Sequence, residues 1–432
     1  MKRLLLSVVG ALMFASSARA AELTLDEAVR LARANHPQIQ AAHAQLEVSA
    51  ARVLEARASL LPQVGGAASY QRSTRNASTT TLPAGSTTPV TVTGVSSSNA
   101  YNLGLTASQL IYDFGQTTGR WDAAKATLQA QEQSERSSAV QIFFNLRSAY
   151  HTAAAARAMV RVAEENLHNQ EAHLRQIQGF VEAGTRPEID LAQARTDRAN
   201  AQVQLINQQV AYDTGKALLN QAMGVERGTD YDVAEPPVQP VEGEDGSTDS
   251  LLPAAIAARP DLLALARQIE AQELTTKSIK GGYAPSLSAS TGLTESGPAI
   301  DNLEWGWYGK LYLNWSIFGG GITDQQLREA RASTAVLRAL YELQRQQVRA
   351  DVEQARLGVR ATKAAIAAAH EAAVNARVRL TLAEGRYQAG VGNVIELGDS
   401  QVALTTAAGQ EVQAIFNLAT ARARLVQALG RP

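Results

Sequence analysis

Apolar residues recur every seven positions along two long stretches of the chain. One series consists of Ala139, Leu146, Ala153, Val160, Leu167, Leu174 and Val181, and between them lie Ile142, Ala149, Ala156, Ala163, Gln170 and Ile177. The other consists of Val352, Val359, Ile366, Ala373, Leu380 and Tyr387, interleaved with Ala355, Thr362, Ala369, Ala376 and Ala383. Such sustained patterns predict coiled-coil helices. The many alanines in them indicate that neighbouring helices approach closely.

Helical character extends well beyond these repeats. Two long helices are expected over about residues 117–181 and 323–388. At 1.5 Å per residue each would be roughly 100 Å long, far beyond the mean helix of about 11 residues. Shorter helices are expected around them, at about residues 37–61, 188–222, 260–281 and 394–429. These lengths fit a helical wall in which each long helix lies beside two shorter ones.

Four shorter stretches alternate with a period of two, which predicts strands with one apolar and one polar face. The clearest is 305–317, whose odd positions include Trp305, Trp307, Leu311, Leu313, Trp315 and Ile317. Residues 101–111 and 287–293 follow the same rule, and 64–70 follow it more weakly. The strands are expected to form hairpins at about 63–113 and 286–318. Within the first hairpin, the Ser/Thr-rich residues 73–98 are expected to be a flexible loop.

The order of these elements occurs twice, because the sequence repeats itself. Pro37 and Pro62 recur 223 positions later as Pro260 and Pro285. The expected fold class is therefore mainly α with a small β part, in which each repeat runs through helix, strand hairpin, long helix, glycine turn and returning helix. The expected divisions are a first repeat at 21–227, an acidic, Pro-rich linker or small irregular element at 228–249, and a second repeat at 250–432.

Composition removes several functional classes. The chain has no cysteine, which excludes disulfides, thiolate nucleophiles, thiolate metal sites and a lipid-modified cysteine behind a signal sequence. Its formal net charge of -1, with acidic and basic residues interspersed, gives no polybasic surface for nucleic acid. Only 5% of the residues are aromatic although 45% are hydrophobic, and the alanine seams of the helices account for the missing large side chains.

The first 20 residues have the pattern of a secretory signal peptide, with Lys2 and Arg3, an apolar stretch and small residues ending at Ala20. A membrane anchor is disfavoured, because a spanning helix needs about 20 apolar residues. Since no other stretch of 18 apolar residues occurs, the mature chain is expected to enter a membrane only through its strands. The two longest strand patterns have about the 9 to 11 residues that cross a bilayer at a tilt. Four strands cannot close a barrel, which takes about eight, whereas three chains would supply twelve.

No arrangement of residues typical of catalysis or of a cofactor site is found. Gly319, Gly320 and Gly321 lack the remaining features of a phosphate loop, and they correspond to Gly115 as a bend between strand and helix. The six histidines are scattered, without an HExxH pair for zinc. There is no GxSxG nucleophile motif and no paired-carboxylate signature. The chain is therefore expected to be no enzyme and to hold no cofactor and no metal.

Three features together match one known family. They are Leu23-Thr24-Leu25-Asp26-Glu27-Ala28 followed by Asn35-His36-Pro37, the duplicated order of elements, and the turns Val181-Glu182-Ala183-Gly184-Thr185 and Tyr387-Gln388-Ala389-Gly390-Val391. With these features the chain resembles the TolC family of outer-membrane efflux and secretion channels. The resemblance implies a homotrimer, with a twelve-stranded β-barrel in the outer membrane of a Gram-negative bacterium and a twelve-helix coiled-coil tunnel in the periplasm.

The same resemblance implies a function and partners. The channel would be the passive exit duct of a tripartite efflux pump or of a type I secretion system. Its partners would be a periplasmic adaptor protein, an inner-membrane pump or exporter, and outer-membrane lipid. The resemblance further implies that the glycine turns form the periplasmic tip where the adaptor docks. The residues placed there are Gly184, Arg186, Tyr387 and Gly390.

The resemblance also implies an entrance constriction lined by Asp190, Glu396 and Asp399. Threefold symmetry would turn each carboxylate into a ring of three, and such rings attract cations. The alternative is that these are ordinary solvated acids at a helix start, where the helix dipole favours negative charge. Gly392 stands where some family members have arginine, which argues against a gate salt bridge at that position.

Two other functions fit parts of the pattern. A soluble periplasmic coiled-coil scaffold or adaptor would keep the hairpins in water, as half-buried soluble strands. The aromatic residues Trp305, Trp307 and Trp315 argue instead for contact with the membrane, because outer-membrane strands carry aromatic girdles. A secreted hydrolase would need a nucleophile constellation that the sequence does not contain.

Overall fold

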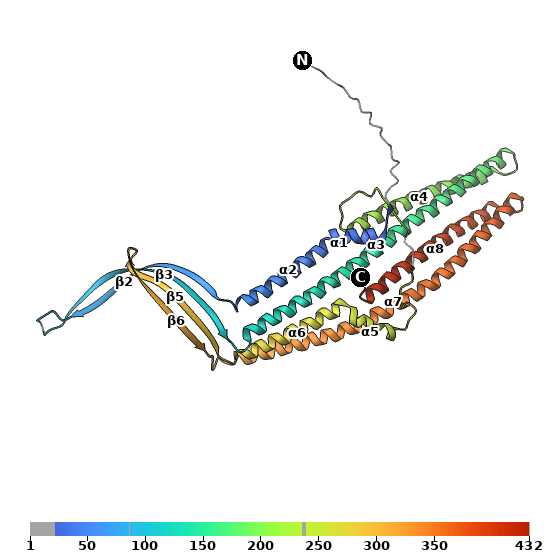
Figure 1. Ribbon diagram of the computed structural model, residues 1–432. Helices are drawn as coiled ribbons and strands as arrows, with labels where there is room; N and C mark the ends of the chain where they lie inside the picture. The colour runs from blue at the N-terminus through green and yellow to red at the C-terminus, as the bar shows by residue number, and fades with distance from the viewer. Residues whose placement is uncertain (1–21, 86, 236–238, 432) are drawn as a thin grey trace, which may run out of the picture. The chain divides into compact units, whose positions relative to one another are not determined.

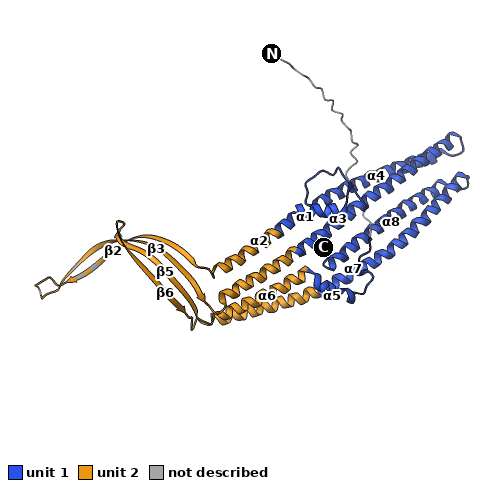
Figure 2. Cartoon of the chain, in the orientation of Figure 1, with its two compact units in different colours: residues 1–42, 136–259, 346–432 blue, residues 43–135, 260–345 orange. Residues whose placement is uncertain are grey.

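The computed structural model describes residues 22–85, 87–235 and 239–431. The signal peptide expected over residues 1–20 lies outside the described residues. Over the described range the chain forms eight α-helices and six β-strands (Figure 1). It divides into two compact units, of which unit 1 contains residues 1–42, 136–259 and 346–432, and unit 2 contains residues 43–135 and 260–345 (Figure 2). Each unit therefore draws on both halves of the sequence.

The helices come in matched pairs, one from each half of the sequence. The short pairs are α1 (Leu25–Asn35) with α5 (Thr248–Ala258), 11 residues each, and α2 (Pro37–Ala58) with α6 (Pro260–Gly281), 22 residues each. The long pairs are α3 (Gln116–Glu182) with α7 (Ile322–Gln388), 67 residues each, and α4 (Glu188–Met223) with α8 (Val394–Ala428), 36 and 35 residues. These lengths confirm a mainly helical, duplicated fold.

Each half begins with two helices rather than the single helix expected from the sequence. The break falls at Pro37 and at Pro260, which are the first residues of α2 and α6. Proline has no backbone N–H, its ring clashes with the preceding turn, and it disfavours α geometry in the residue before it. The preceding residues, His36 and Arg259, are accordingly extended, with ψ angles of 120° and 117°.

In unit 1 the heptad positions of α3 and α7 face inward. None of the seam positions predicted on these two helices is exposed. Leu146 and Ala153 of α3 share one buried core with Leu219 and Met223 of α4. The backbones approach so closely that a Cβ on Gly215 of α4 would lie 3.2 Å from the Cα of Ala153. Small residues thus fill the seam, which explains how long helices pack with few large side chains.

The segment between the repeats is docked on unit 1. Its strand β4 (Asp232–Val233) pairs in parallel with β1 (Glu22–Leu23). Further along, the buried carboxylate of Glu244 accepts two hydrogen bonds of 2.7 Å from the Arg422 guanidinium, and it lies 2.6 Å from Nζ of Lys363. The segment expected to be a linker or small irregular element therefore contains a short strand and a buried ionic cluster.

Unit 2 contains one antiparallel sheet of four strands in the order β2-β3-β5-β6. The strands are β2 (Gln63–Thr81), β3 (Val90–Tyr112), β5 (Ser286–Ala299) and β6 (Asn302–Asn314). All four join a helix at the same end of the sheet, since α2 and α6 precede β2 and β5 while α3 and α7 follow β3 and β6 (Figure 1). β2 and β6 are the two edge strands.

The prediction of a flexible loop over residues 73–98 is wrong. β2 and β3 stay paired as far as Thr81 with Val90, and β3 pairs with β5 only from Tyr101 onward. Within the described chain, residues 71–81 and 90–100, here called the ribbon, therefore pair only with each other and extend beyond β5 and β6 (Figure 1). Serine and threonine suggested a loop, but β-branched threonine favours strands. Hydroxyls also bond across the ribbon, as between Ser73 and Ser98 at 3.0 Å.

Candidate functional site at the helical turns and the sheet

Two glycine turns close the helical hairpins of unit 1. Gly184 lies between α3 and α4 with a φ of 69°, and Gly390 lies between α7 and α8 with a φ of 77°. In each turn the N–H of the residue after the glycine bonds to the carbonyl five positions back, at 2.9 and 3.0 Å. This is a glycine C-cap, in which a left-handed residue lets the following N–H groups satisfy the last helix carbonyls. The two predicted tip glycines thus occupy equivalent turns.

Three residues singled out in the sequence form one cluster that joins the two helical hairpins. Nη2 of Arg186 donates a hydrogen bond of 3.0 Å to the carbonyl oxygen of Tyr387, and the guanidinium carbon lies 4.4 Å from the centroid of the Tyr387 ring. The Tyr387 hydroxyl donates a longer hydrogen bond, of 3.4 Å, to Oδ2 of Asp190. Tyr387 and Asp190 are only 1% and 7% exposed. The cluster therefore ties the first hairpin to the second beside their turns.

The surroundings of Tyr387 keep its hydroxyl protonated. Burial raises the pKa of this hydroxyl, and the nearby Asp190 charge raises it further, because both disfavour the phenolate. The positive charge of Arg186 opposes the shift without reversing it. Tyr387 therefore remains a hydrogen-bond donor to Asp190 throughout the physiological pH range.

The two acids of α8 have different surroundings. Glu396 lies in the first turn of the helix, and its carboxylate is 3.5 Å from Nη1 of Arg386 on α7. Asp399 is exposed, and within the described part of the chain its side chain makes no hydrogen bond or ion pair. Gly392 has little space for a side chain, because a Cβ there would lie 2.9 Å from a backbone nitrogen of α7. Glu396 therefore forms an ion pair with Arg386, a residue that sequence reasoning did not single out.

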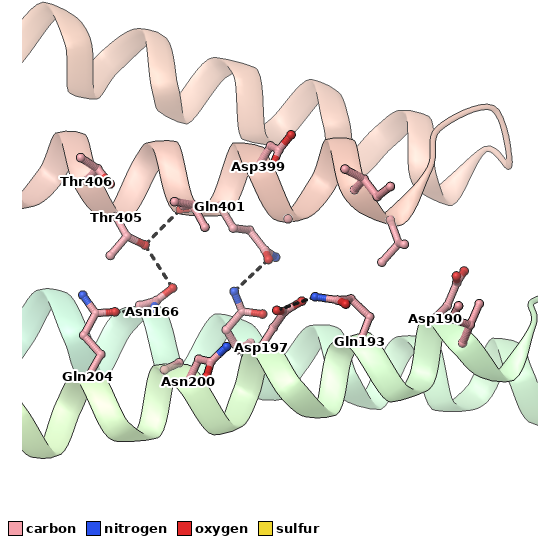
Figure 3. A pocket seen from close by; sticks show the side chains of 17 residues that line it. Asn166, Asp190, Gln193, Asp197, Asn200, Gln204, Asp399, Gln401, Thr405 and Thr406 are labelled. Atoms are coloured by element: carbon pink, nitrogen blue, oxygen red, sulfur yellow. Dashed lines mark hydrogen bonds between the residues drawn. The ribbon is translucent and has the colours of Figure 1, made fainter.

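A cleft of about 680 Å³ lies in unit 1, lined by residues of α3, α4 and α8 (Figure 3). Asp190 and Asp197 line it from α4, and Asp399 lines it from α8. Asp197 accepts a hydrogen bond of 2.9 Å from Gln193, which also lines the cleft. Two of the three predicted constriction residues therefore share one cleft, whereas Glu396 does not line it.

Side-chain amides connect the two helical hairpins within this cleft. Nε2 of Gln170 on α3 donates a hydrogen bond of 2.8 Å to Oε1 of Gln401 on α8. Gln170 is buried, and its Oε1 has no hydrogen-bond partner among the described residues. The described lining also contains three aspartates but no lysine, arginine or histidine. Carboxylates without a cationic side chain among the lining residues favour cationic solutes.

In unit 2 the register separates an apolar face of the sheet from a polar one. Leu313, Leu311, Trp307 and Trp305 of β6 lie opposite Leu287, Ala289, Leu293 and Glu295 of β5. The apolar row continues from Leu293 to Leu105 of β3. On the other face the same three strands carry mainly serine, threonine, glycine and asparagine. An exposed apolar surface of this kind marks contact with lipid or with another chain.

The predicted membrane-facing tryptophans do not all lie in the sheet. Trp305 and Trp307 lie on the apolar face and are 74% and 69% exposed. Trp315 follows the last residue of β6, and its Nε1 donates a hydrogen bond of 3.0 Å to the carbonyl oxygen of Tyr283. Trp315 is therefore anchored where the strands meet the helices.

Within the described part of the chain, no helix is both long enough and apolar enough to cross a membrane. The same residues include no group of three His, Cys, Asp or Glu side chains placed to hold a metal ion.

Comparison with known proteins assigns the chain to a family. The profile described as "Outer membrane efflux protein" matches residues 28–225 and 251–431. The chain belongs to the outer membrane efflux protein family. The match has two parts, one for each half of the sequence, and it confirms the resemblance drawn from the sequence motifs.

Relatives of known name cover nearly the whole chain. The pyoverdine export outer membrane protein OpmQ of Pseudomonas putida is 25% identical over 417 residues, which is 94% of this chain and 85% of OpmQ. The outer membrane efflux protein BepC of Brucella suis is 23% identical over 415 residues, covering 94% of this chain and 85% of BepC. These relatives are transport proteins of the outer membrane.

Solved structures show the same fold. The outer-membrane channel OprN superposes with a TM-score of 0.79 at 19% sequence identity, covering 94% of this chain and 90% of OprN. The outer membrane protein VceC of Vibrio cholerae superposes with a TM-score of 0.77 at 20% identity, covering 94% of this chain and 96% of VceC.

The predicted class and location are thereby confirmed. The chain is an outer-membrane efflux protein, and its family consists of channels and transport components rather than enzymes. The soluble scaffold considered as an alternative is not favoured by these comparisons.

Proposed function

We propose that this outer membrane efflux protein is the exit duct of a tripartite pump, in which three copies of the chain form one channel. The observation that carries the proposal is the two-faced sheet of unit 2, whose edge strands β2 and β6 are both open in the described chain. Side-by-side repetition would pair these edges, with the apolar face toward lipid and the polar face toward the lumen. Three copies would supply twelve strands, whereas the four of one copy are too few to close a barrel.

The duct would work with a periplasmic adaptor and an inner-membrane transporter. One relative from Pseudomonas putida, 24% identical over 415 residues, is named as a probable efflux pump outer membrane protein, TtgC. Such names favour an efflux pump over a type I secretion system for this chain. Outer-membrane lipid would surround the apolar face of the strands, and export across the inner membrane would use the signal peptide proposed for residues 1–20.

Docking and gating are proposed for the glycine turns and the adjoining cleft. The contact of Arg186 with Tyr387 supports a single docking surface, because it fixes the two hairpins to each other beside their turns. The proposed docking residues are Gly184, Arg186, Tyr387 and Gly390. The proposed constriction residues are Asp190, Glu396 and Asp399. The negative cleft shared by Asp190 and Asp399 supports that second assignment.

Fractionation and gel electrophoresis test the assembly directly. We expect the protein in the detergent-extracted outer membrane, as a trimer on unheated denaturing gels that dissociates on boiling. We also expect the purified trimer to conduct ions across planar lipid bilayers. A soluble monomer or dimer in the periplasmic fraction, without channel activity, would contradict the proposal and would support a scaffold instead.

A further inference from the structure

The polar face of the sheet carries a positive charge close to the helices. Lys310 of β6 lies opposite Ser290 of β5, which lies opposite Ser108 of β3, which in turn lies opposite Gln63 of β2. The neighbouring rows on this face contain mainly serine, threonine, glycine and tyrosine, with Leu110 as an apolar exception. Where the described sheet has four strands, Lys310 is the one cation on this face, and Glu304, three rows away, is the one anion. Further out, Arg75 of the ribbon has the register parity of Gln63 and lies on the same face.

The aromatic ring of Tyr308 lies beside this charge. The Tyr308 ring lies across the adjacent strand, where a Cβ on Gly292 would come within 2.6 Å of the ring. Glycine at position 292 therefore makes room for the tyrosine to lie flat against the sheet. Nζ of Lys310 is 4.5 Å from the centroid of that ring, within the range of a cation–π interaction. The ammonium group thus lies close to the sheet.

We propose that Lys310 is a charge-selectivity residue of the duct. This inference rests on the proposed function, because it requires the polar faces of three copies to line one lumen. The threefold axis would then produce a ring of three ammonium groups, near the end of the sheet where the strands join the helices. Such a ring attracts anionic solutes and repels cations. Its effect is opposite to that proposed for the acidic residues of the cleft.

Screening by salt determines when the proposed lysine ring affects ion selectivity. The Debye length is about 30 Å at 0.01 M salt and about 3 Å at 1 M. Lysine charges on the wall therefore act across the lumen only in dilute salt, whereas in concentrated salt they are screened within the width of one side chain. The contribution of Lys310 to ion selectivity should be clear in dilute salt and nearly absent at 1 M.

The experiment measures reversal potentials of purified trimers in planar bilayers, under a KCl gradient kept below 0.1 M. Lys310→Gln should raise the cation-to-anion permeability ratio about threefold, and Lys310→Glu should raise it further, because wall charges shift local ion concentrations. Lys310→Arg should restore the wild-type value, since it keeps the charge. Arg72→Gln is the matched control, because Arg72 has the register parity of Tyr70 on the opposite face and its loss removes the same charge.

The outcomes separate this inference from the proposed function. If wild-type trimers conduct and both Lys310→Gln and Lys310→Glu keep the wild-type reversal potential, the role of Lys310 is refuted while the duct stands. An equal shift in Arg72→Gln would also refute it, because net charge rather than the polar face would then decide. If the wild-type protein forms no conducting trimer, the proposed function itself fails, and the inference fails with it.

Discussion

Glu396 and Asp399 share one helix turn but not one environment. The carboxylate of Glu396 is close to Arg386, which neutralises part of its field, whereas Asp399 is exposed and lines the cleft without a cationic neighbour there. A carboxylate attracts cationic solutes more strongly when no positive side chain nearby cancels part of its charge. If these acids form the proposed constriction, Asp399 should therefore contribute more to cation binding than Glu396.

This difference gives a prediction for single variants. Asp399→Asn should weaken block by a trivalent cation added from the periplasmic side about tenfold, which corresponds to about 1.4 kcal/mol. Glu396→Gln should weaken it less, because Arg386 already offsets that carboxylate. Single-channel block in planar bilayers measures both. Equal, unchanged block in the two variants and in their combination would show that these acids are only solvated residues at a helix start.

The cluster around Tyr387 contains contacts between distant residues that the sequence does not predict. The turn motifs marked Arg186 and Tyr387 separately, but the two residues are 201 positions apart, and no periodicity predicts a contact between them. Asp190 was marked as a constriction residue, whereas the structure places it buried beneath the Tyr387 hydroxyl. Gln170 had one visible signal, a polar residue in an otherwise apolar seam. Its partner Gln401 had none.

At the scale of elements, the segment between the repeats is held by Glu244. Burial alone would raise the pKa of this carboxyl, but hydrogen bonds from Arg422, Lys363 and the Val241 backbone outweigh burial and lower the pKa to about 2. The folded state therefore binds the proton more weakly than the unfolded chain does. The stabilisation is complete above the ordinary pKa of 4.5 and is lost as the pH falls toward 2.

Glu244→Gln tests the importance of this contact. Removing one partner of a buried ion pair leaves the other charge uncompensated, so the Tm at pH 7 should fall by about 5 °C or more. Glu242→Gln is the matched control, because Glu242 lies in the same segment but is 90% exposed and pairs with Arg431 at 3.5 Å. That change should leave the Tm nearly unaltered. The difference in Tm between wild type and Glu244→Gln should become smaller as the pH falls from 4.5 to 2. A difference in Tm that does not change with pH would contradict the stabilising role of the ionised Glu244.

Elements were predictable from sequence where one physical signal dominated. Heptads placed α3 and α7, because a buried seam tolerates few polar residues, and alternation placed the paired part of the sheet. The ribbon was missed because its hydroxyl side chains bond to each other across the strands, a compensation that composition does not show. The expected helices begin correctly at Pro37 and Pro260, but α1 and α5 before them were not predicted, because 11 residues give too short a periodic pattern to stand out.

At the scale of the whole molecule, the two halves are equal except in their hairpins. The paired helices have nearly the same lengths, whereas β2 and β3 have 19 and 23 residues against 14 and 13 for β5 and β6. The excess is the ribbon, which pairs only with itself in the described chain. The elements that both halves share are the helices and the four-stranded part of the sheet, and the proposed trimer would assemble through these elements. The ribbon should be dispensable for it.

Two proline substitutions in the same strand test this division. Val95 of β3 pairs with Asn76 in the ribbon alone, whereas Leu105 of β3 lies between Gly66 of β2 and Leu293 of β5. Proline removes a backbone donor and is not tolerated in the middle of a sheet. Val95→Pro should therefore leave a heat-resistant, conducting trimer, and Leu105→Pro should abolish it. Both side chains are exposed in the single chain, at 72% and 59%, so a difference between the variants would come from strand pairing and not from burial. Loss of the trimer in Val95→Pro would instead show that the ribbon takes part in assembly, as it would if the edge of β2 paired with a neighbouring copy along its full length.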